Sequence, residues 1–225
     1  MTRFALSFIA ASLLTGTAFA ADLQVYEPVD MSDPVAAGNF YASIFGGVSM
    51  INDFDFVSSV NDTPGSMRFD TGYSIDGSLG YDFGNGLSIE GQVGYLNGDA
   101  SGVTYDGVDA DVDGSASITY AMVNGWYGFD LGGISPFIGG GVGVASLAVV
   151  AFFPALPTAS IDDSAVTWAA QVGAGVSFAL TEDISLTGRY RYLTTGEVSL
   201  TDVDLDENTG SASASILDIG LKVAF

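Results

Sequence analysis

The sequence predicts an all-β protein, an eight-stranded antiparallel up-and-down transmembrane β-barrel over residues 39–225. Three observations carry this prediction. Apolar and polar side chains alternate with a period of two residues, as on the two faces of a strand. The alternating segments are even in number, and their connections are short and long in turn. Aromatic residues collect at the strand ends that meet the short connections.

The first twenty residues read as a signal peptide. Arg3 precedes an apolar run over 4–14, and Ala18 and Ala20 fit the small-residue rule for cleavage after Ala20. The alternative is a transmembrane helix, but a run of this length is too short, since a helix needs about 20 apolar residues to span a bilayer. Residues 21–38, with two prolines, are expected to form an N-terminal periplasmic leader.

Eight strands follow in order. Residues 69–82 show the pattern most clearly, with Phe69, Tyr73, Ile75 and Leu79 on one face and Asp70, Ser74, Asp76 and Ser78 on the other. Asn85-Gly86 then gives a strong hairpin signal. The expected strands are 39–50, 67–83, 86–97, 114–130, 135–147, 163–180, 184–195 and 212–225.

The connections favour a barrel that crosses a membrane. Short turns are expected at 84–85, 130–134 and 181–183, and long loops at 51–66, 98–113, 148–162 and 196–211. Outer-membrane barrels combine short periplasmic turns, long outer loops and aromatic girdles. The expected periplasmic girdle is Phe40, Tyr81, Phe83, Tyr127, Phe129, Phe178 and Phe225, and the opposite girdle Tyr95, Trp168 and Tyr192. The alternative is a soluble, lipocalin-like barrel, whose apolar faces point inward.

Charged residues on the polar face predict a network inside the barrel. Arg189 and Arg191 lie two apart and therefore share the inward face, with Asp76 and Asp218 as expected counter-charges. Glu90 and Lys222 are expected nearer the short-turn end. A buried charge without a partner is costly, so a paired network is expected. Inward glycines at 139, 141, 143, 173 and 175 are expected to make room for long side chains from the opposite wall.

Two of the long loops have distinctive compositions. Asp109, Asp111, Asp113 and Gly114 match the front of a calcium loop, but position 12 is Tyr120 instead of a bidentate glutamate. A calcium-binding EF-hand is therefore excluded, and weak divalent-cation binding stays open beside a merely solvated acidic surface. Residues 149–157 are apolar, which leaves open a segment folded over the barrel mouth, one leaning on the lipid boundary, or a partner contact.

Composition excludes several functions. The chain has 5 Lys and Arg against 27 Asp and Glu, and it has no Cys and no His. Removing Arg3 with the signal peptide leaves 4 basic residues, so the formal charge becomes 4 − 27, or −23. No nucleic-acid partner is expected at this charge. No cofactor is expected, and mechanisms that use His or Cys are closed. The sequence therefore predicts a protein that is not an enzyme.

The motifs resemble those of the OmpA/OmpX-like, porin-opacity type of small surface barrels found in alphaproteobacteria. The residues that carry the resemblance are Phe40–Gly47, Val123–Phe129, Pro136–Gly143, Gln171–Val176 and Tyr190–Tyr192. Phe225 resembles the terminal aromatic residue through which this family is assembled by the barrel-assembly machinery. Two departures are that Ala37-Gly38-Asn39 stands in place of the usual Trp-Ser/Thr-Gly, and that no peptidoglycan-binding domain follows residue 225. Tethering to the cell wall is therefore not implied.

Together these features predict a protein of the cell outer membrane of a Gram-negative bacterium, in contact with lipid and lipopolysaccharide. Its expected role is structural or surface-interacting, with the four long loops presented to an extracellular or host partner. A narrow channel for ions or small solutes is the alternative, because wide aqueous pores need 16 or more strands.

Overall fold

The computed structural model describes residues 38–52, 54–58, 63–105, 107–110, 113–152, 161–201 and 207–225. The expected signal peptide and all but the last residue of the leader lie outside this part of the chain. The described residues belong to one compact unit, Val35–Phe225. Eight strands are long: β1 (Asn39–Ile51), β4 (Gly72–Asp82), β5 (Leu87–Tyr105), β7 (Asp113–Gly128), β8 (Ile134–Phe152), β9 (Ile161–Ala179), β10 (Ile184–Thr201) and β11 (Glu207–Ala224). Three are short: β2 (Phe54–Ser58), β3 (Thr63–Phe69) and β6 (Val108–Ala110).

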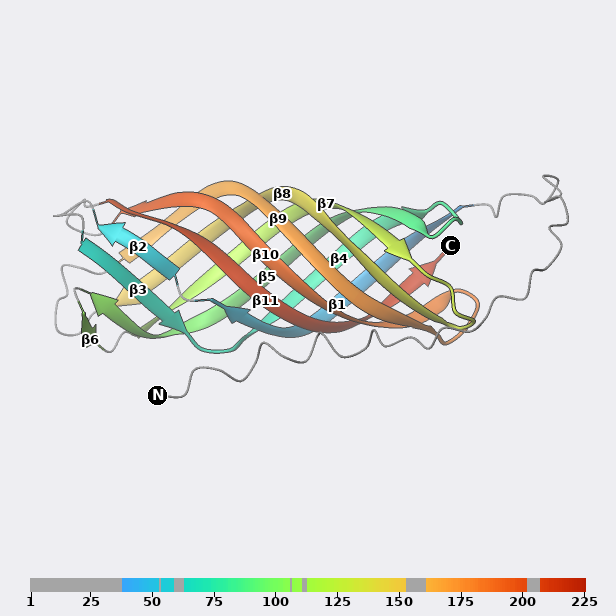
Figure 1. Cartoon of the computed structure of the whole chain (residues 1–225), viewed down its shortest axis with the longest axis horizontal. Coiled ribbons are helices and arrows are strands. Elements are labelled where there is room, and N and C mark those ends of the chain that lie inside the picture. Colours follow the sequence, from blue (N-terminus) through green and yellow to red (C-terminus); the bar gives the residue numbers. More distant parts are fainter. Residues whose placement is uncertain are drawn as a thin grey trace, which may run out of the picture. The chain divides into compact units, whose positions relative to one another are not determined.

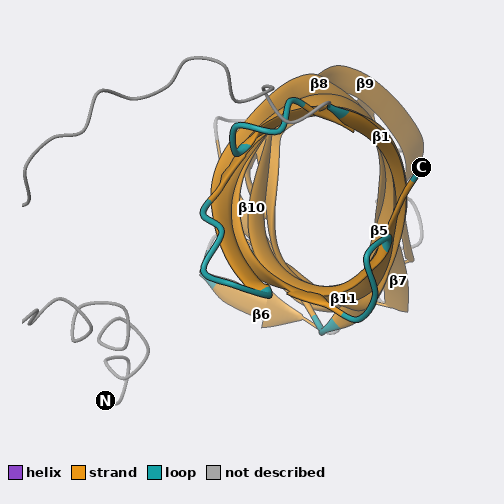
Figure 2. Ribbon diagram, turned by 90° about the vertical axis from the view of Figure 1, so that its right-hand side faces the viewer, coloured by secondary structure: helices purple, strands orange, loops and turns teal. Residues whose placement is uncertain are grey.

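The long strands form a closed antiparallel ring. Each pairs with the next along the chain, from β1–β4 through β10–β11, and β11 pairs back with β1 from Ala224 to Ala214. Figure 1 shows the tilted strands from the side, and Figure 2 shows the ring from its end. Closure pairs the backbone groups that an open sheet would leave at its edges. The predicted eight-stranded barrel is confirmed. No helix in the described part of the chain is long and apolar enough to span a membrane.

Two strands are interrupted instead of continuous. β1 and β4 pair as far as Ser49 and Gly72, and pairing resumes between β2 and β3 at Phe54 and Met67. The expected strand 67–83 is therefore split at Asp70 and Thr71. The pairing of β3 with β5 shifts its register between Arg68 and Phe69, directly beside this break.

The short turns are built by glycine and aspartate. Gly84, Gly86, Gly132 and Gly133 all have positive φ angles, which only glycine adopts without strain. The backbone N–H of Gly84 donates to the carboxylate of Asp82 over 2.9 Å, and that of Gly132 donates to Asp130 over the same distance. The turns at one end of the barrel are thus tight and locally specified.

The outside of the barrel changes character along β5 and β11. On β11 the outward side chains from the short-turn end are apolar as far as Leu217, and beyond it they are Ser215, Ser213 and Ser211. On β5 the same change separates Val93 from Asp99 and Ser101. On β5 and β11 the lower part of the strand therefore belongs to an apolar belt, and the upper part has a polar outside. On β8 and β9 the exposed Val150 and Val166 instead continue the apolar outside into the upper part.

The inward side chains change from charged to apolar at the same level of the barrel. Below, β11 directs Lys222 and Asp218 inward, and above it directs Ile216, Ala214 and Ala212 inward. The upper residues join a buried apolar core: Ile51, Met67, Leu96, Val103, Ala116, Ile118, Tyr120, Met122, Ala145, Leu147, Val149, Ala169, Leu193, Ala212, Ala214 and Ile216. The upper barrel is thus organised like a water-soluble barrel, with its apolar face inside.

Three of the segments predicted to be long loops are partly strand, because the strands continue with their apolar side chains pointing inward. β5 runs to Tyr105, β8 to Phe152 and β10 to Thr201, and each of these ends lies inside a segment expected to be a loop. The alternation of side chains continues there, but with the apolar set pointing inward. The sequence analysis ended each strand where its outward apolar residues end, and these predicted strand ends are therefore too early.

The substitution Gly143→Ala on β8 tests how closely β8 packs against β7 in the barrel wall. An alanine Cβ at Gly143 would lie 2.0 Å from the backbone oxygen of Ala121 on β7. We expect Gly143→Ala to lower the free energy of unfolding by about 1–3 kcal/mol, because backbone on the neighbouring strand must move. Gly125→Ala is the matched control on β7, since a Cβ there meets nothing within 4 Å. Equal denaturant midpoints for the two variants in lipid vesicles would contradict this packing.

Candidate functional site

The lower lumen contains a layer of charged side chains from three strands. The inward residues of β10 are Arg189 and Arg191, and Asp218 of β11 pairs with Arg189 in the strand register. Asp76 comes from β4, on the far side of β1 and β11. All four side chains are buried. Period-two alternation places each of them inward, and barrel closure brings Asp76 to the same level.

Each arginine in this layer contacts both aspartates. Arg189 reaches Asp218 through Nε at 2.8 Å and Asp76 through Nη2 at 2.7 Å. Arg191 reaches Asp218 at 2.6 Å and Asp76 at 2.7 Å, both through Nη2. Two positive and two negative charges are therefore paired within one layer, which we call the charge quartet. Charge-assisted pairs of this kind are the strong ones when they are fully desolvated.

Aromatic rings and amides complete the quartet. The guanidinium of Arg189 lies over the ring of Phe45, 3.5 Å from its centre. Arg191 donates from Nη1 to the Tyr120 hydroxyl and to Oε1 of Gln171, both over 3.0 Å. These contacts occupy guanidinium donors that the aspartates leave over, so the arginines are held in one geometry.

Three amides link the quartet to the other wall of the barrel. Gln92 donates to Asp76 over 2.7 Å, and its own oxygen accepts from Asn124 and from Gln171. Sequence reasoning missed these residues because it followed charged side chains alone. Gln92 stands two residues after Glu90 on the same face, so the alternation already placed it in the lumen.

Glu90 and Lys222 lie below the quartet and are not joined to each other. Glu90 accepts hydrogen bonds from Tyr41, Ser78 and Asn124 over 2.9–3.1 Å. Lys222 lies over the ring of Tyr41, 3.8 Å from its centre, and its Nζ is 3.9 Å from the carboxylate of Asp82. Asp82 and Tyr41 are further members that the sequence did not single out.

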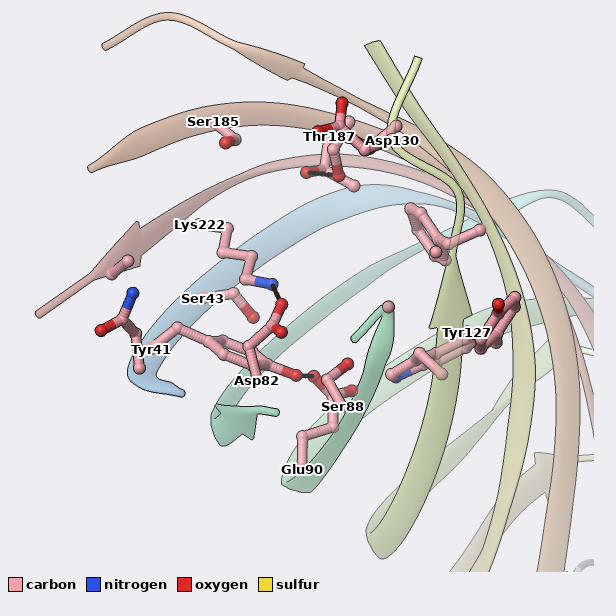
Figure 3. Close-up of a pocket in the computed structure, with 18 of the residues that line it drawn as sticks. Tyr41, Ser43, Asp82, Ser88, Glu90, Tyr127, Asp130, Ser185, Thr187 and Lys222 are labelled. Carbon is pink, nitrogen blue, oxygen red and sulfur yellow. Dashed lines mark hydrogen bonds and ion pairs between the residues drawn. The ribbon is translucent and has the colours of Figure 1, made fainter. Parts of the chain in front are cut away.

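A vestibule opens at the short-turn end. It has a volume of about 780 Å³, and its lining runs from Asp130 and Asp183 near the turns to Arg189. Figure 3 shows Lys222 and Asp82 facing each other across part of it, with Ser43 and Glu90 nearby. Above the vestibule lie first the quartet and then the apolar core. The lumen is therefore accessible from one end and filled by side chains further in.

The inward glycines make room for side chains of neighbouring strands, and this corrects the expectation that they face the opposite wall. A Cβ at Gly173 would meet Arg191 and one at Gly175 would meet Arg189, both on the adjacent β10. A Cβ at Gly141 would meet Asn124 on β7, and one at Gly139 would meet Trp126 on the same strand. Arginine and tryptophan thus lie flat along the wall, because the next strand carries no side chain there.

The aromatic residues expected for the periplasmic girdle all lie at the short-turn end of the barrel. Phe40 and Tyr81 pack edge to face at 5.0 Å, Tyr81 and Phe83 at 5.1 Å, and Tyr127 and Phe129 at 4.9 Å. Phe178 and Phe225 are also exposed on the outside. At the upper edge of the belt lie Tyr95, Trp168 and Tyr192, together with Tyr73, whose ring centre is 6.1 Å from that of Tyr95. Two aromatic edges therefore bound one apolar belt.

Comparisons with known proteins decide the family. The model of the outer membrane protein β-barrel domain matches residues 6–225. The chain belongs to this family. It is therefore an outer-membrane protein, and both the resemblance found in the sequence and the predicted location are confirmed. The apolar belt is the lipid-facing surface of this outer-membrane barrel, and by the rule for such barrels its short turns face the periplasm.

Solved structures of outer-membrane proteins share the fold. OprG of Pseudomonas aeruginosa is 15% identical, with a TM-score of 0.52, over 85% of this chain and 99% of that one. A major outer membrane protein of Thermus thermophilus is 12% identical, with a TM-score of 0.51, over 84% and 100%. The protease OmpT of Escherichia coli is 10% identical, with a TM-score of 0.50, over 83% and 97%. These likenesses establish the fold alone. A search of curated proteins found no match.

The weak metal candidates lie at the edge of the described chain. Asp109 belongs to β6 and Asp113 begins β7, while Asp111 falls outside the described residues. Among the described residues, no group of three or more acidic side chains is placed to hold a metal ion. The apolar segment 149–157 begins on β8, where Val149 points into the apolar core, and most of its remainder lies outside the described residues.

Proposed function

We propose that this outer-membrane barrel is a non-conducting, non-catalytic protein with a structural and surface-presenting role. The observation that carries the proposal is the double filling of the lumen, first by the charge quartet and then by the apolar core. An ion entering from the vestibule meets arginines already paired with aspartates, and beyond them it meets side chains that offer it no ligands.

The absence of histidine and cysteine from the whole chain supports the non-catalytic part of the proposal. The buried carboxylates Asp76 and Asp218 are each held by two arginines inside the lumen, so their oxygens are occupied by partners within the protein. Surface presentation is proposed for the outer ends of the hairpins, where 98–113 carries five acidic residues and 202–207 carries four. Lipopolysaccharide is the proposed neighbour in the outer leaflet, and Phe225 the proposed signal for the assembly machinery.

The conductance of the refolded chain tests this proposal. In planar bilayers we expect no discrete current steps, because two differently filled layers would have to open together. Arg191→Ala is also expected to stay closed, since the apolar core remains. Regular single-channel steps from the unaltered protein would replace the proposal with the narrow channel.

Deletion of the gene separates the two parts of the proposed role. A structural protein is expected to leave an envelope that leaks a periplasmic enzyme and is more sensitive to detergent. An intact envelope would contradict the structural part and leave presentation of the hairpin ends as the role. Expressing a chain with shortened hairpin ends in the deletion strain is the control, and it should restore the permeability barrier.

A further inference from the structure

The vestibule at the periplasmic end contains a buried carboxylate that has no basic partner. Glu90 lines the vestibule and is 5% exposed. It accepts hydrogen bonds from Tyr41, Ser78 and Asn124, which are all neutral groups. No basic side chain of the described chain lies within ion-pair distance of Glu90, whereas each aspartate of the charge quartet is paired with two arginines. A buried carboxylate without a counter-charge is costly, so a cation that enters the vestibule finds a partner there.

The lining of the vestibule as a whole is anionic. Its carboxylates outnumber its basic groups, and the side chains concerned are Asp82, Glu90, Asp130, Glu182 and Asp183 against Arg189 and Lys222. Arg189 is already paired with both aspartates of the charge quartet. Five carboxylates therefore face one ammonium group, which leaves 5 − 1, or four, formal negative charges. A cleft lined by one sign of charge concentrates ions of the opposite sign, so the vestibule attracts cations.

The carboxylates are spread along the vestibule instead of gathered around one point. Ser88 is opposite Asp82 in the strand register, and Glu90 lies two residues further in along β5, roughly 7 Å of strand. The other three carboxylates belong to the short turns at the mouth. Among the residues that the structure describes, no three acidic side chains are placed to share a metal ion. The arrangement therefore fits several positive centres on one elongated molecule better than a single metal ion.

Lys222 shows how the vestibule holds an ammonium group. Its Nζ lies over the ring of Tyr41, 3.8 Å from the ring centre, and 3.9 Å from the carboxylate of Asp82 (Figure 3). Trp126 and Phe137 add further ring surface to the lining, with their ring centres 5.5 Å apart. Aromatic faces attract cations, and their apolar surface packs against methylene groups. A ligand whose ammonium groups are joined by methylene chains matches this combination of carboxylates and rings.

We propose that the vestibule binds a linear polyamine from the periplasm, that is, an aliphatic chain with several protonated amines. One ammonium group donates to Oε1 of Glu90, which among the described residues accepts a hydrogen bond from Asn124 alone. The other ammonium groups lie at the carboxylates nearer the mouth, and the methylene chains between them lie against the aromatic rings. Binding is carried by opposite charges, several of them exposed to water, so added salt weakens it.

Titration with spermidine, a linear polyamine with three amines, tests the proposal. The full chain is placed in phosphatidylcholine nanodiscs, which leave both ends of the barrel accessible and contain no anionic lipid. The chain has two tryptophans, and Trp168 is exposed on the outside, so Trp168→Phe leaves Trp126 of the vestibule lining as the reporter. Its emission is expected to change saturably with spermidine. In this reporter chain, Glu90→Gln is expected to raise the half-saturating concentration at least about tenfold, because it removes the buried partner of one ammonium group.

A second variant decides the question if Glu90→Gln does not fold, as judged by its gel mobility before and after heating. Glu182→Gln/Asp183→Asn changes two exposed residues of a short turn, so the barrel is expected to fold. The half-saturating concentration of spermidine should rise about three- to tenfold, because exposed charge pairs contribute less than buried ones. Asp70→Asn/Asp99→Asn is the matched control, since it removes the same formal charge from exposed residues outside the vestibule. It should bind spermidine like the reporter chain.

Three results would overturn the proposal. They are the lack of a saturable change in emission, equal half-saturation for the turn variant and its control, and an equal response to magnesium chloride at the same ionic strength. Tetralysine that binds more tightly than spermidine would also overturn it, because the vestibule would then be a site for a basic peptide instead of a polyamine.

Discussion

Replacing Arg191 with alanine is expected to lower the free energy of unfolding by about 3–5 kcal/mol, because it leaves buried aspartates short of a counter-charge. Arg191 is fully buried and contacts Asp76, Asp218, Tyr120 and Gln171. Its loss leaves Arg189 alone against two carboxylates. Denaturant unfolding of the barrel in lipid vesicles measures the effect.

Arg68→Ala is the matched control, since Arg68 is an exposed arginine on β3 with a hydrogen bond to Thr104. Exposed polar contacts of this kind contribute about 1 kcal/mol or less. Adding Asp218→Asn to Arg191→Ala should recover part of the lost stability, because the layer then has one positive and one negative charge. If the double variant is no more stable than Arg191→Ala, the charge imbalance is not the cause.

The charged residues of the lumen could be placed from the sequence because a strand has only two faces. Arg189 and Arg191 share one face, and Asp76 and Asp218 fall on the corresponding faces of β4 and β11. Distance from the short turns then sets their height. Alternation and height together predicted the counter-charges of the two arginines, but they did not give the partners of Glu90 and Lys222, which depend on the stagger of the closed barrel. Glu90 and Lys222 illustrate the point, since they lie at the same end yet contact different partners.

The upper barrel was not predictable by the same rule. The sequence rule for a transmembrane strand asks for apolar residues outside, and this condition ends at Leu217 on β11 and at Val93 on β5. Beyond these residues, water replaces lipid outside the barrel, so the favourable arrangement is reversed. Ile216 and Leu96 belong to this reversed pattern, and both are fully buried. On β5 and β11 the two faces of the strand therefore exchange where the strand leaves the apolar belt.

Leu193→Ala tests this exchange of faces, and we expect it to lower the free energy of unfolding by about 2–5 kcal/mol. Leu193 is fully buried in the apolar core and lies opposite Ala214 on β11, where a cavity would be left. Leu217→Ala is the matched control, because Leu217 is 56% exposed on the adjacent strand and faces lipid. Lipid chains are as apolar as leucine and can fill the space, so the control should change much less.

Proteolysis from the outside locates the damage. If the upper barrel is held together by its own core, Leu193→Ala should make β10 and β11 cleavable above the belt, while the lower strands stay protected by lipid. Arg191→Ala acts within the belt and should leave the upper strands as resistant as before. Two results would mean that the core does not stabilise the upper barrel. One is equal resistance to the protease of Leu193→Ala, Arg191→Ala and the unaltered protein, and the other is equal unfolding midpoints for Leu193→Ala and Leu217→Ala. If the variants differ as expected, the charge quartet stabilises the lower half of the strands and the apolar core stabilises the upper half, because each half is surrounded by a different solvent.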